Sequence, residues 1–341
     1  MTHLINQRVV LARRPTGAAT VDDLRIESAP VGDLREGELL LRTLWLSLDP
    51  YMRGRMSDAA SYAAPVEVGA VMTGGTVARV EASRRAGFEP GELVVCMSGW
   101  QEFAVSDGTG LLKLPAATTR PSYALGVLGM PGFTAYMGLL DIGKPRAGET
   151  VAVAAATGAV GSVVGQIGKL QGCRVVGIAG GPEKCAWAVD ELGFDACIDH
   201  HSPELPMLLR AACPEGIDVY FENVGGKIFR AVVPLLNKHA RIPVCGLIAN
   251  YQGENTGASE DFTAALMRAV LVQRITMRGF IIFDDYGPRF TEFRDSMAAW
   301  LRDGRIRYRE DVVDGLANAP AAFIGLLAGR NFGKLVVKVG M

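Results

Sequence analysis

The chain has 341 residues, of which 49% are hydrophobic and 21% charged, and its formal net charge is -1. These values are typical of a globular protein of about two domains. The near balance of charge gives no electrostatic reason to expect nucleic acid or an anionic membrane as a partner. No run approaches the roughly 20 apolar residues of a spanning helix, and the charged N-terminal stretch does not resemble an export signal. We therefore expect a cytoplasmic protein.

The first part of the chain, residues 1–125, consists of short β-like runs that glycine and proline interrupt. Examples are GELLLRTLWLSLDP (37–50), GAVMTGGTVARVEA (69–82) and GELVVCMSGWQEFAVS (91–106). Turn signals recur every ten or so residues, a pattern that favours a barrel-like β domain.

From about Thr150 the pattern changes to alternating strands and helices. The strands are expected at TVAVAAA (150–156), RVVGIAG (174–180), ACIDH (196–200), DVYFENV (218–224), RIPVCGLIA (241–249) and TMRGFIIFD (276–284). The helices are expected at EKCAWAVDEL (183–192), GKIFRAVVPLLNK (226–238), DFTAALMRAVLVQR (261–274) and FTEFRDSMAAWLRDG (290–304). Such alternation predicts a parallel, doubly wound sheet, the Rossmann arrangement, in an α/β protein. A last strand, GKLVVKV (333–339), is expected to return to the first domain.

A glycine turn follows the first of these strands. Ala155, Gly158 and Gly161 are spaced A-x-x-G-x-x-G, and Gly165 follows in the expected helix. Glycines let backbone N–H groups approach a pyrophosphate, and the helix N-terminus adds favourable partial charge. The alternative is that these glycines serve only the packing of the helix on the sheet. The strand–turn–helix context favours dinucleotide binding.

The end of the second strand indicates which dinucleotide binds. An NAD site usually carries an acidic residue there, which bonds the ribose 2′-hydroxyl. Here Ala179, Gly180 and Gly181 occupy that place, and Glu183 comes too late. Lys184 is well placed to meet a 2′-phosphate, although it could also be an ordinary solvated helix lysine. We therefore expect NADPH/NADP+ rather than NAD.

A β domain followed by such a nucleotide domain resembles the medium-chain dehydrogenase/reductase superfamily, many members of which hold a catalytic zinc. Zinc needs Cys, His or carboxylate ligands. The chain has only four histidines. The stretch LSLDPYMRG (46–54), where zinc members carry a cysteine, contains no cysteine. The six cysteines form no Cys-x-x-Cys pair, and most lie in apolar runs, as reduced, buried thiols do. We expect no metal.

Without a metal, another group must polarise the substrate. Hydride transfer to an activated C=C bond leaves an enolate oxygen that needs a hydrogen-bond donor. A tyrosine hydroxyl can donate, and its high pKa keeps it protonated at neutral pH. Tyr251, just after the end of an expected strand, is the candidate because ligands of open α/β sheets bind beyond the carboxyl ends of the strands. The alternative is an ordinary loop tyrosine.

Seven motifs make the resemblance closer. They are LSLDPYMRGRM (46–56), MPGFTAYMGL (130–139), GAVGSVVGQI (158–167), ENVGG (222–226), CGLIANY (245–251), GFIIFD (279–284) and GRNFGKLVVKV (329–339). In this order they resemble the zinc-independent branch that contains the prostaglandin reductases, the plant alkenal double-bond reductases and bacterial curcumin reductase. The resemblance implies a GroES-like β domain (1–125 and 307–341) and an NADP-binding Rossmann domain (126–306).

The resemblance also implies an activity and its residues: NADPH-dependent reduction of the C=C bond of an enone or alkenal, with Tyr251 steadying the enolate. The cofactor residues it implies are Gly158, Ala159, Val160, Gly161, Gly180, Lys184, Asn223, Cys245, Gly246, Ile248, Phe280, Ile281, Ile282 and Asn331, with Met130 and Thr134 near the nicotinamide. Tyr51, Arg53 and Trp100 are expected on the substrate side. Where related reductases carry a tyrosine near the 2′-phosphate, this chain has His200, which could still donate a hydrogen bond.

Other readings stay open. A quinone reductase of the same superfamily would share the cofactor site without requiring Tyr251, and a non-catalytic NADPH-binding protein would ignore all acceptors. An alcohol dehydrogenase is disfavoured because the zinc ligands are missing.

The apolar strand TMRGFIIFD would lie at an edge of the sheet, where it needs cover. We therefore expect a homodimer.

Overall fold

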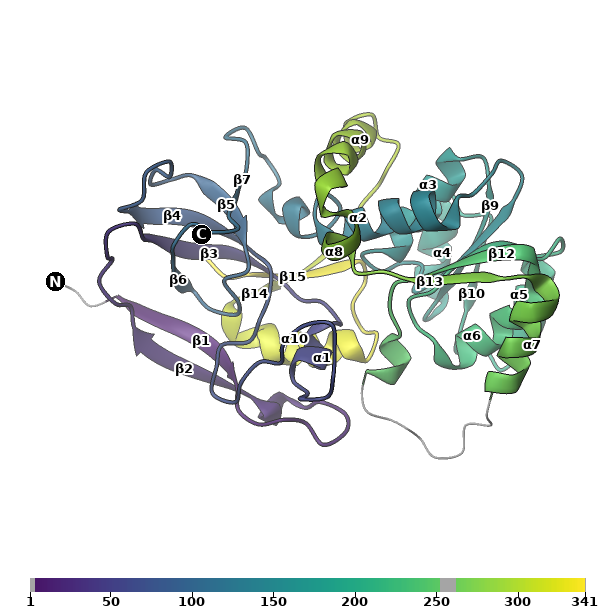
Figure 1. The fold of residues 1–341 in the computed structure, drawn as a ribbon, viewed down its shortest axis with the longest axis horizontal. Helices are drawn as coiled ribbons and strands as arrows, with labels where there is room; N and C mark the ends of the chain where they lie inside the picture. Colours follow the sequence, from purple (N-terminus) through teal and green to yellow (C-terminus); the bar gives the residue numbers. More distant parts are fainter. Residues whose placement is uncertain (1–3, 252–261, 341) are drawn as a thin grey trace.

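The computed structural model describes residues 4–251 and 262–340. A β-rich part and a parallel α/β part lie side by side along the long axis (Figure 1), and both termini lie at the β-rich end. Six of the strands, β8 to β13, fall between residues 150 and 279, while β14 and β15 return to the sheet of the first part. The two-part architecture expected from the sequence is confirmed.

The β-rich part contains a hairpin-like pair and a larger sheet. Strands β1 (Ile5–Leu11) and β2 (Leu24–Pro30) pair with each other. The larger sheet has the order β14-β15-β3-β4-β5-β7, with β6 paired to β3. Its strands are β3 (Leu39–Ser47), β4 (Thr76–Ser83), β5 (Leu93–Cys96), β6 (Phe103–Ser106), β7 (Leu112–Lys113), β14 (Glu310–Asp314) and β15 (Lys334–Lys338). Two helices accompany it, α1 (Met52–Arg55) and α10 (Ala319–Leu327).

The α/β part is built on a six-stranded parallel sheet in the order β10-β9-β8-β11-β12-β13. Its strands are β8 (Thr150–Ala154), β9 (Arg174–Ala179), β10 (Ala196–Asp199), β11 (Ile217–Phe221), β12 (Leu236–Val244) and β13 (Thr276–Gly279). Counted from β8, this is the order 3-2-1-4-5-6 of a dinucleotide-binding sheet, and the strand order reverses between β8 and β11.

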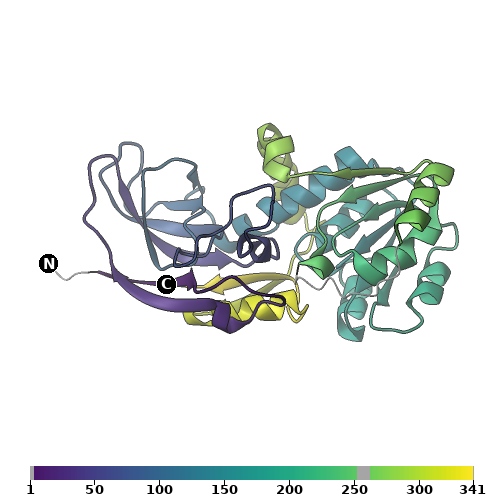
Figure 2. The same cartoon turned by 60° about the horizontal axis from the view of Figure 1, so that its bottom comes forward.

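Helices cover both faces of this sheet (Figures 1 and 2). They are α2 (Met130–Met137), α3 (Gly161–Leu170), α4 (Pro182–Asp190), α5 (Leu205–Ala212), α6 (Gly226–Val232), α7 (Thr263–Gln273), α8 (Ile282–Tyr286) and α9 (Phe290–Arg302). Strand side chains alternate between the faces. In β8, Val151 and Val153 join the core under α2, α3 and α9, whereas Ala152 and Ala154 join the core under α5 and α6. A buried layer on each face explains the continuous apolar runs in the sequence.

Several expected elements differ from the structure at their ends; the strand expected over 241–249, for example, is Leu236–Val244. The helix expected over 226–238 stops at Val232, and a short turn at Val233–Leu235 leads into β12, because Pro234 cannot donate a helical hydrogen bond. The strand expected over 276–284 ends at Gly279, and Ile282 already begins α8. In the described part of the chain, no helix is both long and apolar enough to cross a membrane.

Candidate active site

A cavity of about 1780 Å³ lies between the two parts, at the carboxyl ends of the parallel strands. Sites for drug-sized molecules typically measure about 300–1,000 Å³. The cavity can therefore hold a dinucleotide together with a second small molecule. Its lining includes residues 47–51, 128–131, 155, 157–161, 179–180, 245–246, 280–284 and 326–329.

The glycine turn forms one wall of the cavity, and its glycines have different tasks. Gly158 and Gly161 line the cavity together with Ala159 and Val160. A Cβ on Gly161 would collide with the carbonyl oxygen of Ala155, so this position needs glycine for the turn itself. Gly165, one turn later in α3, lies against the ring of Phe194. The packing role considered from the sequence is therefore present at Gly165, while Gly158 and Gly161 line the cavity, where we expect the ligand.

The turn after β11 completes the switch point of the sheet. Asn223 lines the cavity, and its side-chain amide donates a hydrogen bond to the carbonyl of Ala154 at 2.8 Å. One carboxylate oxygen of the buried Glu222 accepts from the backbone N–H groups of Val224 and Gly225, at 2.6 and 2.8 Å. Burial raises the pKa of Glu222. These bonds fix the direction in which Asn223 faces the cavity.

The expected 2′-phosphate end lies beyond β9. Gly180, Lys184 and His200 all line the cavity, and a Cβ on Gly180 would lie 3.0 Å from Nε2 of His200. A larger side chain at Gly180 would therefore crowd the histidine. The amine of Lys184 donates to the carbonyl of Gly329 at 2.7 Å, and burial lowers the pKa of Lys184.

The segment from Cys245 to Tyr251 curls at the end of β12. Cys245, Gly246, Ile248 and Tyr251 line the cavity. The hydroxyl of Tyr251 accepts a hydrogen bond from the backbone N–H of Leu247 at 3.3 Å. Burial raises the pKa of Tyr251. A Cβ on Gly246 would lie 3.1 Å from the Tyr251 hydroxyl, so the glycine leaves room for that oxygen.

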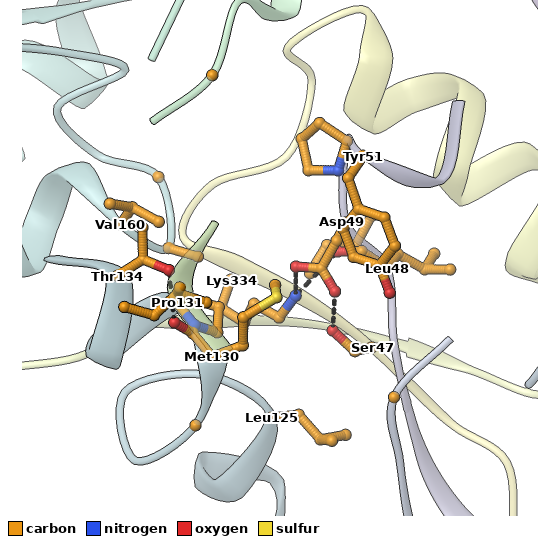
Figure 3. Close-up of a pocket in the computed structure, with 18 of the residues that line it drawn as sticks. Ser47, Leu48, Asp49, Tyr51, Leu125, Met130, Pro131, Thr134, Val160 and Lys334 are labelled. Carbon is orange, nitrogen blue, oxygen red and sulfur yellow. Dashed lines mark hydrogen bonds and ion pairs between the residues drawn. The ribbon is translucent and has the colours of Figure 1, made fainter. Parts of the chain in front are cut away.

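The expected nicotinamide region lies on the other side of the switch point. Met130 and Thr134 line the cavity from α2, and the Thr134 hydroxyl donates to the Met130 carbonyl at 2.8 Å (Figure 3). Asn331 also lines it and donates from its side chain to the carbonyl of Gly333 at 2.8 Å. The apolar run Phe280, Ile281 and Ile282, between β13 and α8, lines the cavity as well.

Of the three residues expected on the substrate side, only Tyr51 lies in the cavity. Arg53 is 5% exposed and donates to the carbonyl of Gly17 at 2.6 Å. Residues two apart on a helical turn face opposite directions, so α1 cannot present both Tyr51 and Arg53 to one site. Trp100 is fully buried, with its ring edge-on to Phe323 at 5.5 Å. Arg53 and Trp100 are therefore core residues rather than cavity residues.

The structure brings to the cavity several side chains that the sequence analysis missed. Arg55, four residues after Tyr51, lines the cavity, and its guanidinium lies 4.3 Å from the ring centre of Tyr62, which lines it too. The spacing of four residues on a helical turn was the signal that could have identified Arg55. Asp49 and Lys334 also line the cavity, but they are far apart in sequence and no local pattern joins them.

No three or more His, Cys, Asp and Glu side chains gather at a possible metal position in residues 4–251 and 262–340. All six cysteines are free thiols. Burial raises the pKa of Cys245 to about 12, so this thiol stays protonated at neutral pH. The polar side chains that line the cavity include hydroxyl and amide groups, such as those of Tyr251 and Asn223, and charged groups, such as those of Arg55, Lys184 and Asp49. The hydrogen-bond donors among them suit recognition of phosphate and carbonyl oxygens.

Known proteins resemble this chain over its whole length. Residues 7–114 match a model described as the N-terminal domain of oxidoreductase, and residues 159–302 match one described as zinc-binding dehydrogenase. The NADPH-dependent curcumin reductase of Escherichia coli is 56% identical over 334 residues, 98% of this chain and 97% of that protein. The NADP(+)-dependent 2-alkenal reductase of Nicotiana tabacum is 39% identical over 340 residues, 98% and 97% of the two chains.

A solved structure shares the fold almost completely. The crystal structure of CurA from Vibrio vulnificus in complex with NADPH has a TM-score of 0.95 and 58% sequence identity, and covers 98% of this chain and 99% of CurA. The similarity spans both parts of the molecule. The chain therefore belongs to the medium-chain dehydrogenase/reductase branch of the curcumin, prostaglandin and 2-alkenal reductases.

Proposed function

We propose that this protein reduces the C=C bond of α,β-unsaturated ketones or aldehydes with NADPH, and that Tyr251 stabilises the enolate. Membership of a branch whose relatives are named curcumin, prostaglandin and 2-alkenal reductases supports the reaction class. The observation that carries the role of the tyrosine is its position in the cavity, with its hydroxyl against the N–H of Leu247.

The residues around the cavity fit NADPH, which supplies a hydride when bound. Gly158 to Gly161 offer backbone N–H groups at the start of α3 for the pyrophosphate. Lys184 and His200 offer side-chain donors for the 2′-phosphate. Their common position along one cavity supports binding of a single extended ligand.

Tyr251 suits the substrate oxygen for electrostatic reasons. Its hydroxyl already accepts a hydrogen bond from Leu247, so its own proton is available for a second partner. Burial raises its pKa, which keeps that proton in place at neutral pH. As hydride reaches the β-carbon of the substrate, negative charge collects on the carbonyl oxygen, and a fixed donor there lowers the barrier.

The test compares Tyr251→Phe with a matched control. Loss of one such donor typically lowers turnover by roughly 10²–10³-fold, while NADPH binding should not change, because the aromatic ring remains. Tyr286→Phe is the control: Tyr286 is also buried and bonded, to Asp141 at 2.8 Å, but lies outside the lining of the cavity. Undiminished enone turnover in Tyr251→Phe would refute the role of the tyrosine.

A further inference from the structure

A buried ion pair forms part of the cavity wall. The amine of Lys334 lies 2.6 Å from one carboxylate oxygen of Asp49 and donates to the carbonyl of Leu48 at 2.9 Å. The other carboxylate oxygen accepts from the hydroxyl of Ser47. Lys334 is 1% exposed and Asp49 is 6% exposed. Figure 3 shows Asp49 between Ser47 and Lys334, with Met130 and Pro131 on the other side of the lysine.

Stability alone does not explain this pair. Desolvating two charges is costly, and replacing a buried ion pair with apolar side chains of similar size is often neutral or stabilising. Both residues nevertheless lie in the wall of the cavity in which the ligands are expected to bind. We therefore infer that a charged pair in this place has a role in the site itself.

The pair lies where two strands separate. Strands β3 and β15 are antiparallel, with Ser47 opposite Val336, and the N–H of Leu48 still donates to the carbonyl of Leu335 at 3.2 Å. The next position in this register places Asp49 opposite Lys334. There the chain leaves β3 and enters α1. Beyond this point the side-chain ion pair, instead of backbone hydrogen bonds, joins the two segments.

Each partner is close in sequence to a different part of the cavity. Asp49 is two residues before Tyr51, on the expected substrate side. Lys334 directly follows Gly333, which forms an isolated parallel bridge with Gly158 of the glycine turn. The ion pair therefore connects the wall that carries Tyr51 to the turn expected to hold the pyrophosphate.

We propose that Lys334 and Asp49 are a positioning pair for catalysis. The pair holds the wall that carries Tyr51 at a fixed distance from the glycine turn at Gly158. Hydride transfer is steep in distance, so a small displacement of the substrate lowers the rate strongly. The proposal rests on the proposed enone reduction. It predicts that loss of the pair lowers turnover while NADPH still binds.

The test uses the double variant Lys334→Met/Asp49→Leu beside the two single variants. Each single variant leaves an uncompensated charge or acceptor and should melt at a lower temperature, whereas the double variant should regain thermal stability. In the double variant we expect kcat for an enone to fall roughly 10–100-fold, with NADPH affinity unchanged by fluorescence titration. The primary deuterium isotope effect with NADPD should rise, because hydride transfer becomes more rate-limiting.

The control replaces another ion pair in the same way. Arg241 and Glu149 form a partly buried pair that lies outside the lining of the cavity. Arg241→Met/Glu149→Leu should leave kcat and the isotope effect unchanged. Should the double variant of the cavity pair fail to fold, Ser47→Ala, which removes only the hydroxyl bonded to Asp49, should still lower kcat at constant NADPH affinity; an unchanged kcat there contradicts the proposal.

The outcomes separate this proposal from the function on which it rests. Wild-type kcat and isotope effect in a stable double variant would show that the pair is only structural, and would overturn the proposal while leaving enone reduction intact. Absence of enone turnover in the wild-type protein would overturn the proposed function and the positioning role with it.

Discussion

The side-chain amide of Asn223 donates a hydrogen bond to the carbonyl oxygen of Ala154 at 2.8 Å. The bond joins the carboxyl ends of β8 and β11, the two strands between which the order of the sheet reverses. Ligands of doubly wound sheets bind at this point. The bond therefore holds together the two strand ends from which the expected cofactor site is built.

Asn223→Ala should weaken both the fold and NADPH binding. Loss of one hydrogen bond with a buried partner costs about 1–3 kcal/mol of unfolding free energy, and the two strand ends lose their connection. Asn237→Ala is a suitable control, because its amide donates to the carbonyl of Glu215 at 2.9 Å away from the cavity. Denaturation and fluorescence titration should show destabilisation in both variants but weaker NADPH binding only in Asn223→Ala. Equal NADPH affinity in both would contradict this role.

Lys184→Ala should reduce the preference for NADPH over NADH. A hydrogen bond to a charged group is worth about 1.5–3 kcal/mol, so the Kd for NADPH should rise roughly 10–100-fold. NADH lacks the 2′-phosphate, so its affinity should stay the same. Lys169→Ala serves as control, because that lysine, in α3, pairs at 2.8 Å with Asp195, just before β10, and lies outside the lining. An equal loss of affinity for NADPH and for NADH would show that Lys184 has only a structural role, through its hydrogen bond to Gly329.

His200 should make NADPH affinity depend on pH. Burial, with the charge of His201 as a second cause, lowers the pKa of His200 in the free protein, so the imidazole is neutral at neutral pH. A bound phosphate favours the protonated form and raises that pKa, so binding takes up a proton. NADPH affinity should therefore increase as the pH falls from about 8 to about 6.5. His200→Ala should lack this slope; the same slope, or an unchanged affinity, would disprove the contact.

The same lowered pKa has a consequence for stability. The unfolded chain protonates His200 at a higher pH than the folded protein does. The contribution of neutral His200 to the free energy of unfolding is therefore fully present above the pKa that His200 has in the unfolded chain. It is lost as the pH falls through the lowered folded pKa. Acid unfolding of His200→Ala should accordingly be less steep than that of the wild type in this pH window.

A second copy of the chain should pair along the open edge of the parallel sheet. Strand β13 forms that edge, with Met277 40% exposed, and Leu271 on the preceding helix is 78% exposed. Sedimentation at micromolar concentration should give a homodimer. Met277→Glu should weaken it, because like charges would meet across the two-fold axis, whereas Met207→Glu, on the exposed face of α5, should not. A monomeric wild-type mass would contradict the pairing.

The fold could be predicted because its strands are short, apolar and regularly spaced. All six strands of the parallel sheet lie within or overlap the expected runs. The errors lie at the ends, where local chemistry decides: Pro234 stops α6, and Ile282 begins a helix inside an apolar run that is typical of a strand. The residues expected on the cofactor side line one cavity, because they follow strand ends that the topology brings together.

The substrate side could not be predicted to the same degree. Tyr51 and Arg53 share one motif, yet a single helical turn sends them in opposite directions. Trp100 was expected there and instead fills the core beside Phe323. Lys334 and Asp49 are separated by 285 residues, so no sequence spacing could reveal their contact.

The most direct test of enone reduction is the rate of NADPH and NADH oxidation with a panel of acceptors: a long 2-alkenal, an aryl enone, a quinone and a saturated ketone. We expect turnover of the alkenal and the enone with NADPH, little with NADH, and none of the saturated ketone. Turnover of the quinone alone would contradict it and identify a quinone reductase. Tight NADPH binding without turnover of any acceptor would contradict it as well, because the cavity would then bind the dinucleotide without enone chemistry.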